Sequence, residues 1–176
     1  EEDTQKALYR PAELSRFKAG LDENGALAAY DNVFTHRDDP KEASVPGIYA
    51  IPNTSVRVAE AERHLPFAAW RSVDHSQHGW FIESFIDEAA HAAKADPYEY
   101  RLAMLAEAPR HAAVLKKVAE ISDWSAPRSE GRSKGIAIVE SFGSIVAQVI
   151  EVDMSAGKPR MTNVWAVCDA GYVVNP

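Results

Sequence analysis

The sequence contains a single cysteine, Cys168, among its 176 residues. One thiol cannot form an internal disulfide, and it cannot supply the several sulfur ligands of a thiolate metal centre. A disulfide framework and a multi-thiolate site are therefore excluded. A chain of this length buries about 70% of the surface that its unfolded form exposes, so its core needs no covalent staple.

Long apolar runs and an excess of positive charge are also missing. No stretch approaches the roughly 20 consecutive apolar residues of a membrane-spanning helix, and nothing resembles a signal peptide. Asp and Glu (26) outnumber Lys and Arg (19), which gives a formal net charge of −7. This charge disfavours nucleic acid and anionic membrane surfaces as partners. We therefore expect neither a nucleic-acid partner nor membrane insertion.

The short motifs that hold nucleotides or activate a serine are absent. The sequence has no Gly-x-Ser-x-Gly elbow, no Walker loop and no Gly-x-Gly-x-x-Gly fingerprint. Hydrolase, P-loop and dinucleotide-binding functions thus have no motif to support them.

What is present is a change of periodicity that divides the chain into three stretches, over residues 1–75, 76–124 and 135–176. In the first stretch, β-forming runs over residues 14–21 and 27–35 flank an Asn-Gly pair, which is typical of a hairpin turn. Extended segments follow over residues 47–64. The third stretch again reads as strands, so the order predicts an α+β fold of mostly antiparallel sheet with the helices packed on one face.

The middle stretch is helical by its pattern. Apolar residues recur at helical spacing from Phe81 to Ala93, while Glu83 and Asp87 share the opposite face, which we expect to be solvated. Asp96, followed by proline, predicts the start of a second helix. A third helix is expected over residues 109–121, and strands over 135–140, 145–153 and 160–169.

The segment over residues 65–77 carries the chain from an extended run into the first long helix. Such a junction exposes unpaired backbone N–H groups at the positive end of the helix dipole, and both favour an anion such as pyrophosphate. Arg71 adds a guanidinium that suits phosphate oxygens, and polar side chains follow at Ser72, His75, Ser76 and Gln77. The alternative is that Asp74 caps the helix, with Gln77 as its capping-box partner, while Arg71 pairs with a carboxylate.

Two further features suggest sites less strongly. His75 and His78 stand three residues apart, with His64 upstream, but Asp74 and Glu83 are the only nearby candidates for further ligands. Because zinc sites need matched third and fourth ligands, we predict no metal site.

The second feature is the segment over residues 140–144, which joins two predicted strands. Its glycine lies between hydroxyl side chains and the large aromatic Phe142, a composition suited to the lip of an apolar pocket. An ordinary tight turn with Phe142 in the core is the alternative.

Several stretches together resemble the large molybdopterin-binding subunit of the xanthine dehydrogenase and aldehyde oxidase family, of the isoquinoline 1-oxidoreductase β-subunit type. They run in order through nearly the whole chain: residues 2–5, 9–11, 49–53, 70–73, 81–88, 96–102, 140–144, 146–149, 169–171 and 173–176. The resemblance implies a molybdenum hydroxylase that oxidises an N-heterocycle or an aldehyde with oxygen from water. It also implies the molybdopterin cofactor and an iron–sulfur partner subunit that accepts the electrons.

The resemblance also implies roles for individual residues. Arg71 and Gln77 match family positions that contact the cofactor, while Val73, Phe142 and Gly143 match positions that border the substrate pocket. The family pattern has glycine where this chain has Asp74, a carboxylate that would repel a pyrophosphate.

The chain lacks the Gly-Gly-Gly-Phe-Gly loop and the Gly-x-Gly-Glu segment with its catalytic glutamate, which the family places upstream and downstream of the matched region. We therefore expect an internal fragment, with no catalytic residue of its own and no turnover or cofactor binding in isolation. A non-catalytic interaction domain is the competing hypothesis, and a small histidine-dependent metalloenzyme is a third.

Overall fold

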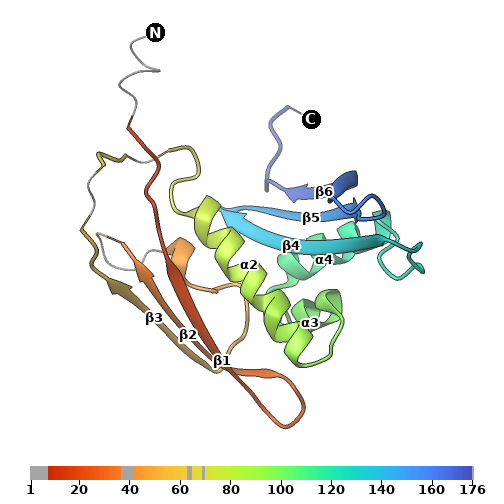
Figure 1. Ribbon diagram of the computed structural model, residues 1–176, viewed down its shortest axis with the longest axis horizontal. Coiled ribbons are helices and arrows are strands. Elements are labelled where there is room, and N and C mark those ends of the chain that lie inside the picture. Colours follow the sequence, from red (N-terminus) through yellow and green to blue (C-terminus); the bar gives the residue numbers. More distant parts are fainter. Residues whose placement is uncertain (1–7, 37–41, 63–64, 69, 176) are drawn as a thin grey trace.

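The computed structural model describes residues 8–36, 42–62, 65–68 and 70–175, in two small sheets joined by a central helix (Figure 1). The first sheet has the order β1 (Ser15–Leu21), β2 (Leu27–Thr35), β3 (Asn53–Ala59), and the second β4 (Arg132–Ser141), β5 (Ser144–Asp153), β6 (Arg160–Asp169). The helices are η1 (Glu42–Ser44, 3-10), α2 (His75–Ala92), α3 (Pro97–Met104) and α4 (Pro109–Ile121). The predicted α+β class is confirmed.

The helix α2 connects the two sheets, because it contacts β1 on one side and β4 on the other (Figure 1). The helix α4 packs on β5 and β6. The core lies between these helices and the second sheet, where side chains from all three elements are fully buried: Ile86 and Ala90, Leu115 and Val118, Ile145 and Val149. No described helix has both the length and the apolar content that crossing a bilayer requires.

Local sequence signals account for the first hairpin and for the start of α3. In the turn between β1 and β2, the Asp22 carboxylate accepts hydrogen bonds from the N–H groups of Asn24 (2.8 Å) and Ala26 (2.9 Å), and Gly25 adopts φ +83°. Asp96 accepts from two N–H groups in the first turn of α3, as its cap position predicts. Both expectations are confirmed.

The strand β3 pairs with β2 in parallel, from Ala29↔Asn53 to Thr35↔Ala59. All other strand pairs are antiparallel. The residues predict extended structure here, but a strand's direction depends on the path of its connection. The segment from Glu42 to Pro52, which includes η1, brings the chain to the end of the sheet where β2 begins, so β3 runs parallel to β2.

The expectation that Glu83 faces solvent is wrong. Glu83 is 5% exposed, and one of its carboxylate oxygens accepts hydrogen bonds from Arg101 Nε (2.9 Å) and from the N–H of Ile138 (2.9 Å). The other oxygen accepts from the Tyr49 hydroxyl at 2.6 Å. Asp87 remains half-exposed and accepts from Arg101 Nη1 at 2.6 Å. A buried ion pair thus joins α2, α3, β4 and the segment before β3.

This network explains the direction of two pKa shifts. Burial, reinforced by the neighbouring Glu83 charge, raises the pKa of Tyr49 well above its ordinary value. The hydroxyl therefore stays protonated and donates a hydrogen bond to Glu83. Burial alone would lower the pKa of Arg101, but the combined attraction of Glu83, Tyr49 and Asp87 outweighs it and the net shift is upward.

We expect Arg101→Met to lower the free energy of unfolding by about 3–5 kcal/mol, because it leaves the Glu83 carboxylate buried without its cation. Arg110→Met is the matched control, since Arg110 forms an ion pair with Asp169 at the surface and its side chain is 52% exposed. Urea denaturation of both variants measures their free energies of unfolding. Equal, small losses in the two variants would show that the buried pair does not stabilise the fold.

Candidate functional site

The chain enters α2 through a strained turn. Ser72 and Val73 adopt φ +71° and +46°, a region that a β-branched residue such as valine rarely occupies. The N–H of Val73 donates to the Trp70 carbonyl (2.8 Å) and that of His75 to the Ser72 carbonyl (2.9 Å). Asp74 itself has φ −81°, so the backbone here does not require the glycine of the family pattern.

Two backbone N–H groups in the first turn of α2 remain available. Asp74 occupies the cap position but makes no capping hydrogen bond, which contradicts the capping alternative. Among the described residues, the N–H groups of Ser76 and Gln77 have no backbone acceptor. Unpaired N–H groups at the positive end of a helix dipole are suited to an anion.

Arg71 precedes these groups and is exposed, and no described residue forms a hydrogen bond or ion pair with its guanidinium. Its alternative role as the partner of a carboxylate is therefore not found in the described part of the chain. Arg10 provides a second guanidinium at the same place, since it donates to the Ser76 hydroxyl and lies 5.4 Å from the centre of the Trp70 ring. Sequence reasoning missed Arg10 as a site residue because it lies about 60 residues upstream of Arg71.

The segment that carries Arg10 is fixed beside the entry to α2 by backbone hydrogen bonds. The N–H of Tyr9 donates to the Pro66 carbonyl (3.2 Å), and the N–H of Ala68 donates to the Tyr9 carbonyl (3.1 Å). The Trp70 indole donates to the Leu8 carbonyl at 3.0 Å. The position of Arg10 thus follows from local pairing rather than from its own side chain alone.

The side chain of Gln77 points into the protein, toward Glu13, and not toward the exposed side chain of Arg71. Its Nε2 donates to Asp74 Oδ1 (3.2 Å) and to Glu13 Oε1 (3.3 Å). The Asp74 carboxylate is turned the same way, with Oδ1 3.7 Å from His36 Nε2 and only 13% of the side chain exposed. The repulsion of an anion that the sequence suggests for Asp74 is reduced by this orientation.

His78 lies on the inner face of the same helix turn and is 1% exposed. Burial lowers its pKa to about 4, so the ring is neutral at pH 7. His75, by contrast, lies on the outer side, and its ring centroid is 5.0 Å from that of Phe142. The two histidines that the sequence places three residues apart therefore belong to different surroundings. His64, the third histidine of that group, lies outside the described residues.

Phe142 and Gly143 form the two-residue turn between β4 and β5. Their φ angles of +52° and +79° match a type I′ hairpin turn. Phe142 is 77% exposed, so the alternative that places it in the core is wrong. The contact between Phe142 and His75 brings this turn to the start of α2, beside the segment that carries Arg71 and Val73.

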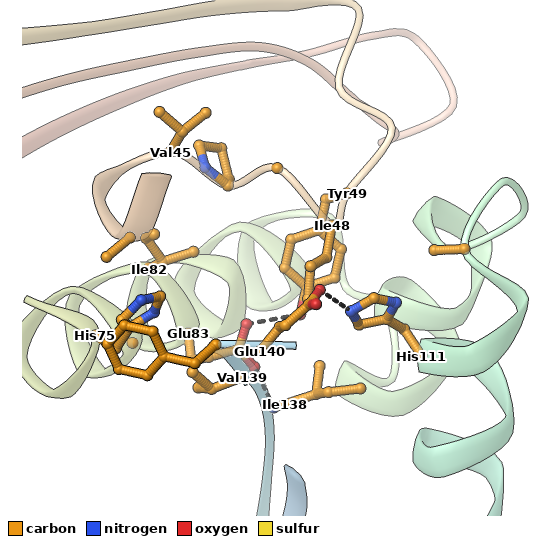
Figure 2. A pocket seen from close by; sticks show the side chains of 16 residues that line it. Val45, Ile48, Tyr49, His75, Ile82, Glu83, His111, Ile138, Val139 and Glu140 are labelled. Carbon is orange, nitrogen blue, oxygen red and sulfur yellow. Dashed lines mark hydrogen bonds and ion pairs between the residues drawn. The ribbon is translucent and has the colours of Figure 1, made fainter. Parts of the chain in front are cut away.

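A cavity of about 250 Å³ lies between α2, β4, the start of α4 and the segment before β3 (Figure 2). Phe142 and His75 line one part of it. Elsewhere, His111 Nε2 is 2.8 Å from Glu140 Oε2, and Figure 2 shows these two side chains directed at each other. Val73 and Gly143 do not line this cavity. Of the three predicted pocket residues, the structure places only Phe142 there.

The chain is similar to several known proteins, although it matches no model of a protein family. It is 32% identical over 133 residues, 73% of its length, to the beta subunit of isoquinoline 1-oxidoreductase from Brevundimonas diminuta. It is 30% identical, over 98% of its length, to a subunit of nicotinate dehydrogenase from Pseudomonas putida. Its fold resembles that of quinoline 2-oxidoreductase from Pseudomonas putida 86, with a TM-score of 0.57 over 80% of the chain at 18% identity.

The chain belongs to the molybdenum hydroxylase family. The chain spans 17% of the isoquinoline 1-oxidoreductase subunit, 18% of the nicotinate dehydrogenase subunit and 22% of the quinoline 2-oxidoreductase chain. The family resemblance identified from the sequence is therefore confirmed.

We expect Val73→Gly to raise the free energy of unfolding by about 1 kcal/mol, because relief of the left-handed strain exceeds the entropic cost of glycine. Val45→Gly is the control, since Val45 is similarly exposed (38% against 41%) but does not have positive φ. Thermal unfolding measures the stability of both variants relative to the wild type. A loss of stability in both variants would mean that the turn at Val73 carries no strain.

Proposed function

We propose that this chain is an internal part of a molybdenum hydroxylase subunit, where it forms one wall of the cleft that holds the molybdopterin cofactor and the substrate. The subunit would oxidise an N-heterocycle or an aldehyde with oxygen from water. The observation that carries this proposal is the start of α2, where the Arg71 guanidinium and the N–H groups of Ser76 and Gln77 have no partner among the described residues.

These groups fit the anionic part of a phosphorylated pterin. Arg71 offers a planar fork of N–H donors and the helix start offers two backbone donors, all of which suit phosphate oxygens. Arg10 adds a further positive charge at the same turn. Because the side chain of Gln77 is engaged with Asp74 and Glu13, its contribution to cofactor binding would come from its backbone N–H.

The substrate side of the cleft would be formed by the turn that meets α2. Phe142 presents an exposed ring beside His75, and Val73 is 41% exposed on the neighbouring segment. Gly143 has nothing within 4 Å of the position that a Cβ would take, so the chain leaves open space there. An exposed aromatic ring beside open space is suited to stacking on a planar heterocycle.

The cofactor, when bound, supplies the two-electron redox chemistry. The residues of this chain would bind and orient it and would shape the approach of the substrate. The glutamate base of the family lies outside the chain, and the electrons would pass to an iron–sulfur partner subunit. We therefore propose that the chain alone binds no cofactor and has no turnover.

In the full subunit, Arg71→Ala should lower the molybdenum cofactor content of the purified enzyme, because the anion loses its guanidinium partner. Arg71→Lys should keep part of the content, since it keeps the charge but not the fork. Arg160→Ala is the control, on a side chain that is 73% exposed at the far end of the second sheet. Elemental analysis for molybdenum reads the result, and unchanged occupancy in Arg71→Ala would contradict the assignment.

Phe142→Asn should raise the KM for the heterocycle or aldehyde while the molybdenum content stays unchanged. Asparagine tolerates positive φ, so this variant keeps the turn and removes only the ring. Steady-state kinetics on the full enzyme measures the effect, with Met154→Asn as the control, since Met154 is 46% exposed and follows the other end of β5. An unchanged KM would place Phe142 outside the substrate pocket.

A non-catalytic interaction domain is the second candidate. One observation favours it, namely that Trp80 on α2 is 68% exposed, and large exposed aromatic side chains are enriched at protein interfaces. Under this hypothesis Arg71→Ala leaves the molybdenum content unchanged and Trp80→Ala weakens assembly of the complex. Gel filtration of the two variants together with cofactor analysis separates the hypotheses.

A further inference from the structure

Behind the start of α2, four side chains from three distant parts of the sequence converge. They are Glu13 before β1, His36 after β2, Asp74 at the cap of α2 and Gln77 in its first turn. His36 Nε2 lies 3.4 Å from Glu13 Oε1 and 3.7 Å from Asp74 Oδ1. The terminal amide of Gln77 lies 3.3 Å and 3.2 Å from the same two oxygens. Each of these four polar atoms therefore lies within 3.7 Å of two of the others.

These separations have the size of a tetrahedral coordination shell. Zinc binds carboxylate oxygen and imidazole nitrogen at about 2.0–2.2 Å, so its donors in a tetrahedron stand about 3.3–3.6 Å apart. Four of the six separations within the set are 3.2, 3.3, 3.4 and 3.7 Å, which lie around this range. Glu13, His36 and Asp74 each offer a ligand atom, and these atoms all lie within 4.8 Å of one another.

The charge and burial of the cluster also suit a cation. The side chains of Glu13, His36 and Asp74 are 1%, 7% and 13% exposed. Two carboxylates removed from water need compensating positive charge, and a divalent ion with a neutral imidazole makes the set neutral.

The amide of Gln77 can become a metal ligand by rotation about its last side-chain bond alone. Its Nε2 now faces the carboxylates while its Oε1 accepts from the Ser76 hydroxyl at 3.0 Å. A half-turn about the last side-chain bond exchanges nitrogen and oxygen at nearly the same positions, because the amide is close to symmetric in shape. The oxygen would then face the centre, and the NH₂ group would donate to Ser76.

We propose that Glu13, His36, Asp74 and Gln77 bind one divalent transition-metal ion of the zinc type, with carboxylate, imidazole and amide ligands. His78 lies beside the first ligand, with its Nε2 3.5 Å from Glu13 Oε2. The ion would be structural. It ties the ends of β1 and β2 to the helix start that presents the Ser76 and Gln77 N–H groups.

The test uses the full-length protein after removal of metal with a chelator. Titration with zinc, followed by calorimetry and elemental analysis, should show one bound equivalent and a rise in melting temperature. Substitution with cobalt(II) should give the intense visible absorption of a tetrahedral site. Absence of a bound equivalent in the wild-type protein would overturn the proposal.

Three variants make the test specific. His36→Ala should weaken zinc binding by more than the factor of about 10–100 that the loss of a supporting residue costs. His91→Ala, an exposed histidine at the other end of α2, should bind zinc as the wild type does. Gln77→Glu should tighten binding, because an anionic ligand replaces a neutral one. Should His36→Ala fail to fold, affinity in Gln77→Glu that is no higher than in the wild type would itself overturn the assignment.

Discussion

The buried ion pair between Glu83 and Arg101 holds the architecture together. It lies where α2, α3, β4 and the segment before β3 meet, and each of these elements contributes a partner to one carboxylate or to the guanidinium that pairs with it. Removing the Arg101 guanidinium would leave the Glu83 carboxylate buried without its cation. The ion pair therefore fixes α2 relative to the second sheet, and with it the position of the Phe142 turn beside the helix start.

Much of the fold could be predicted from local signals. The Asn-Gly turn, the Asp96 cap with its proline and the helical spacing of apolar residues each depend on neighbours within a few positions, and the structure has all of them. The parallel direction of β3 and the burial of Glu83 could not be predicted in this way. Both depend on partners far along the chain: β2 for the strand, and Arg101 and Tyr49 for the carboxylate.

The candidate site shows the same division. Arg71 and the free N–H groups of α2 could be proposed from one continuous segment, and the composition of residues 140–144, like the resemblance, indicated Phe142. Arg10, Glu13 and His36 were missed because each lies more than 30 residues from the helix that it meets. The direction of the Gln77 side chain depends on Glu13, which no short sequence pattern connects to it.

The backbone of the turn at Phe142 and Gly143 limits which residues can border the proposed substrate pocket there. Both residues need a left-handed backbone, which valine, isoleucine and threonine resist and which glycine, asparagine and aspartate accept. Related proteins that keep the two-residue hairpin can therefore not adjust the opening with branched aliphatic groups at this point. Changes in the width of the pocket opening would have to come from a longer loop between β4 and β5 or from residues on the facing segments.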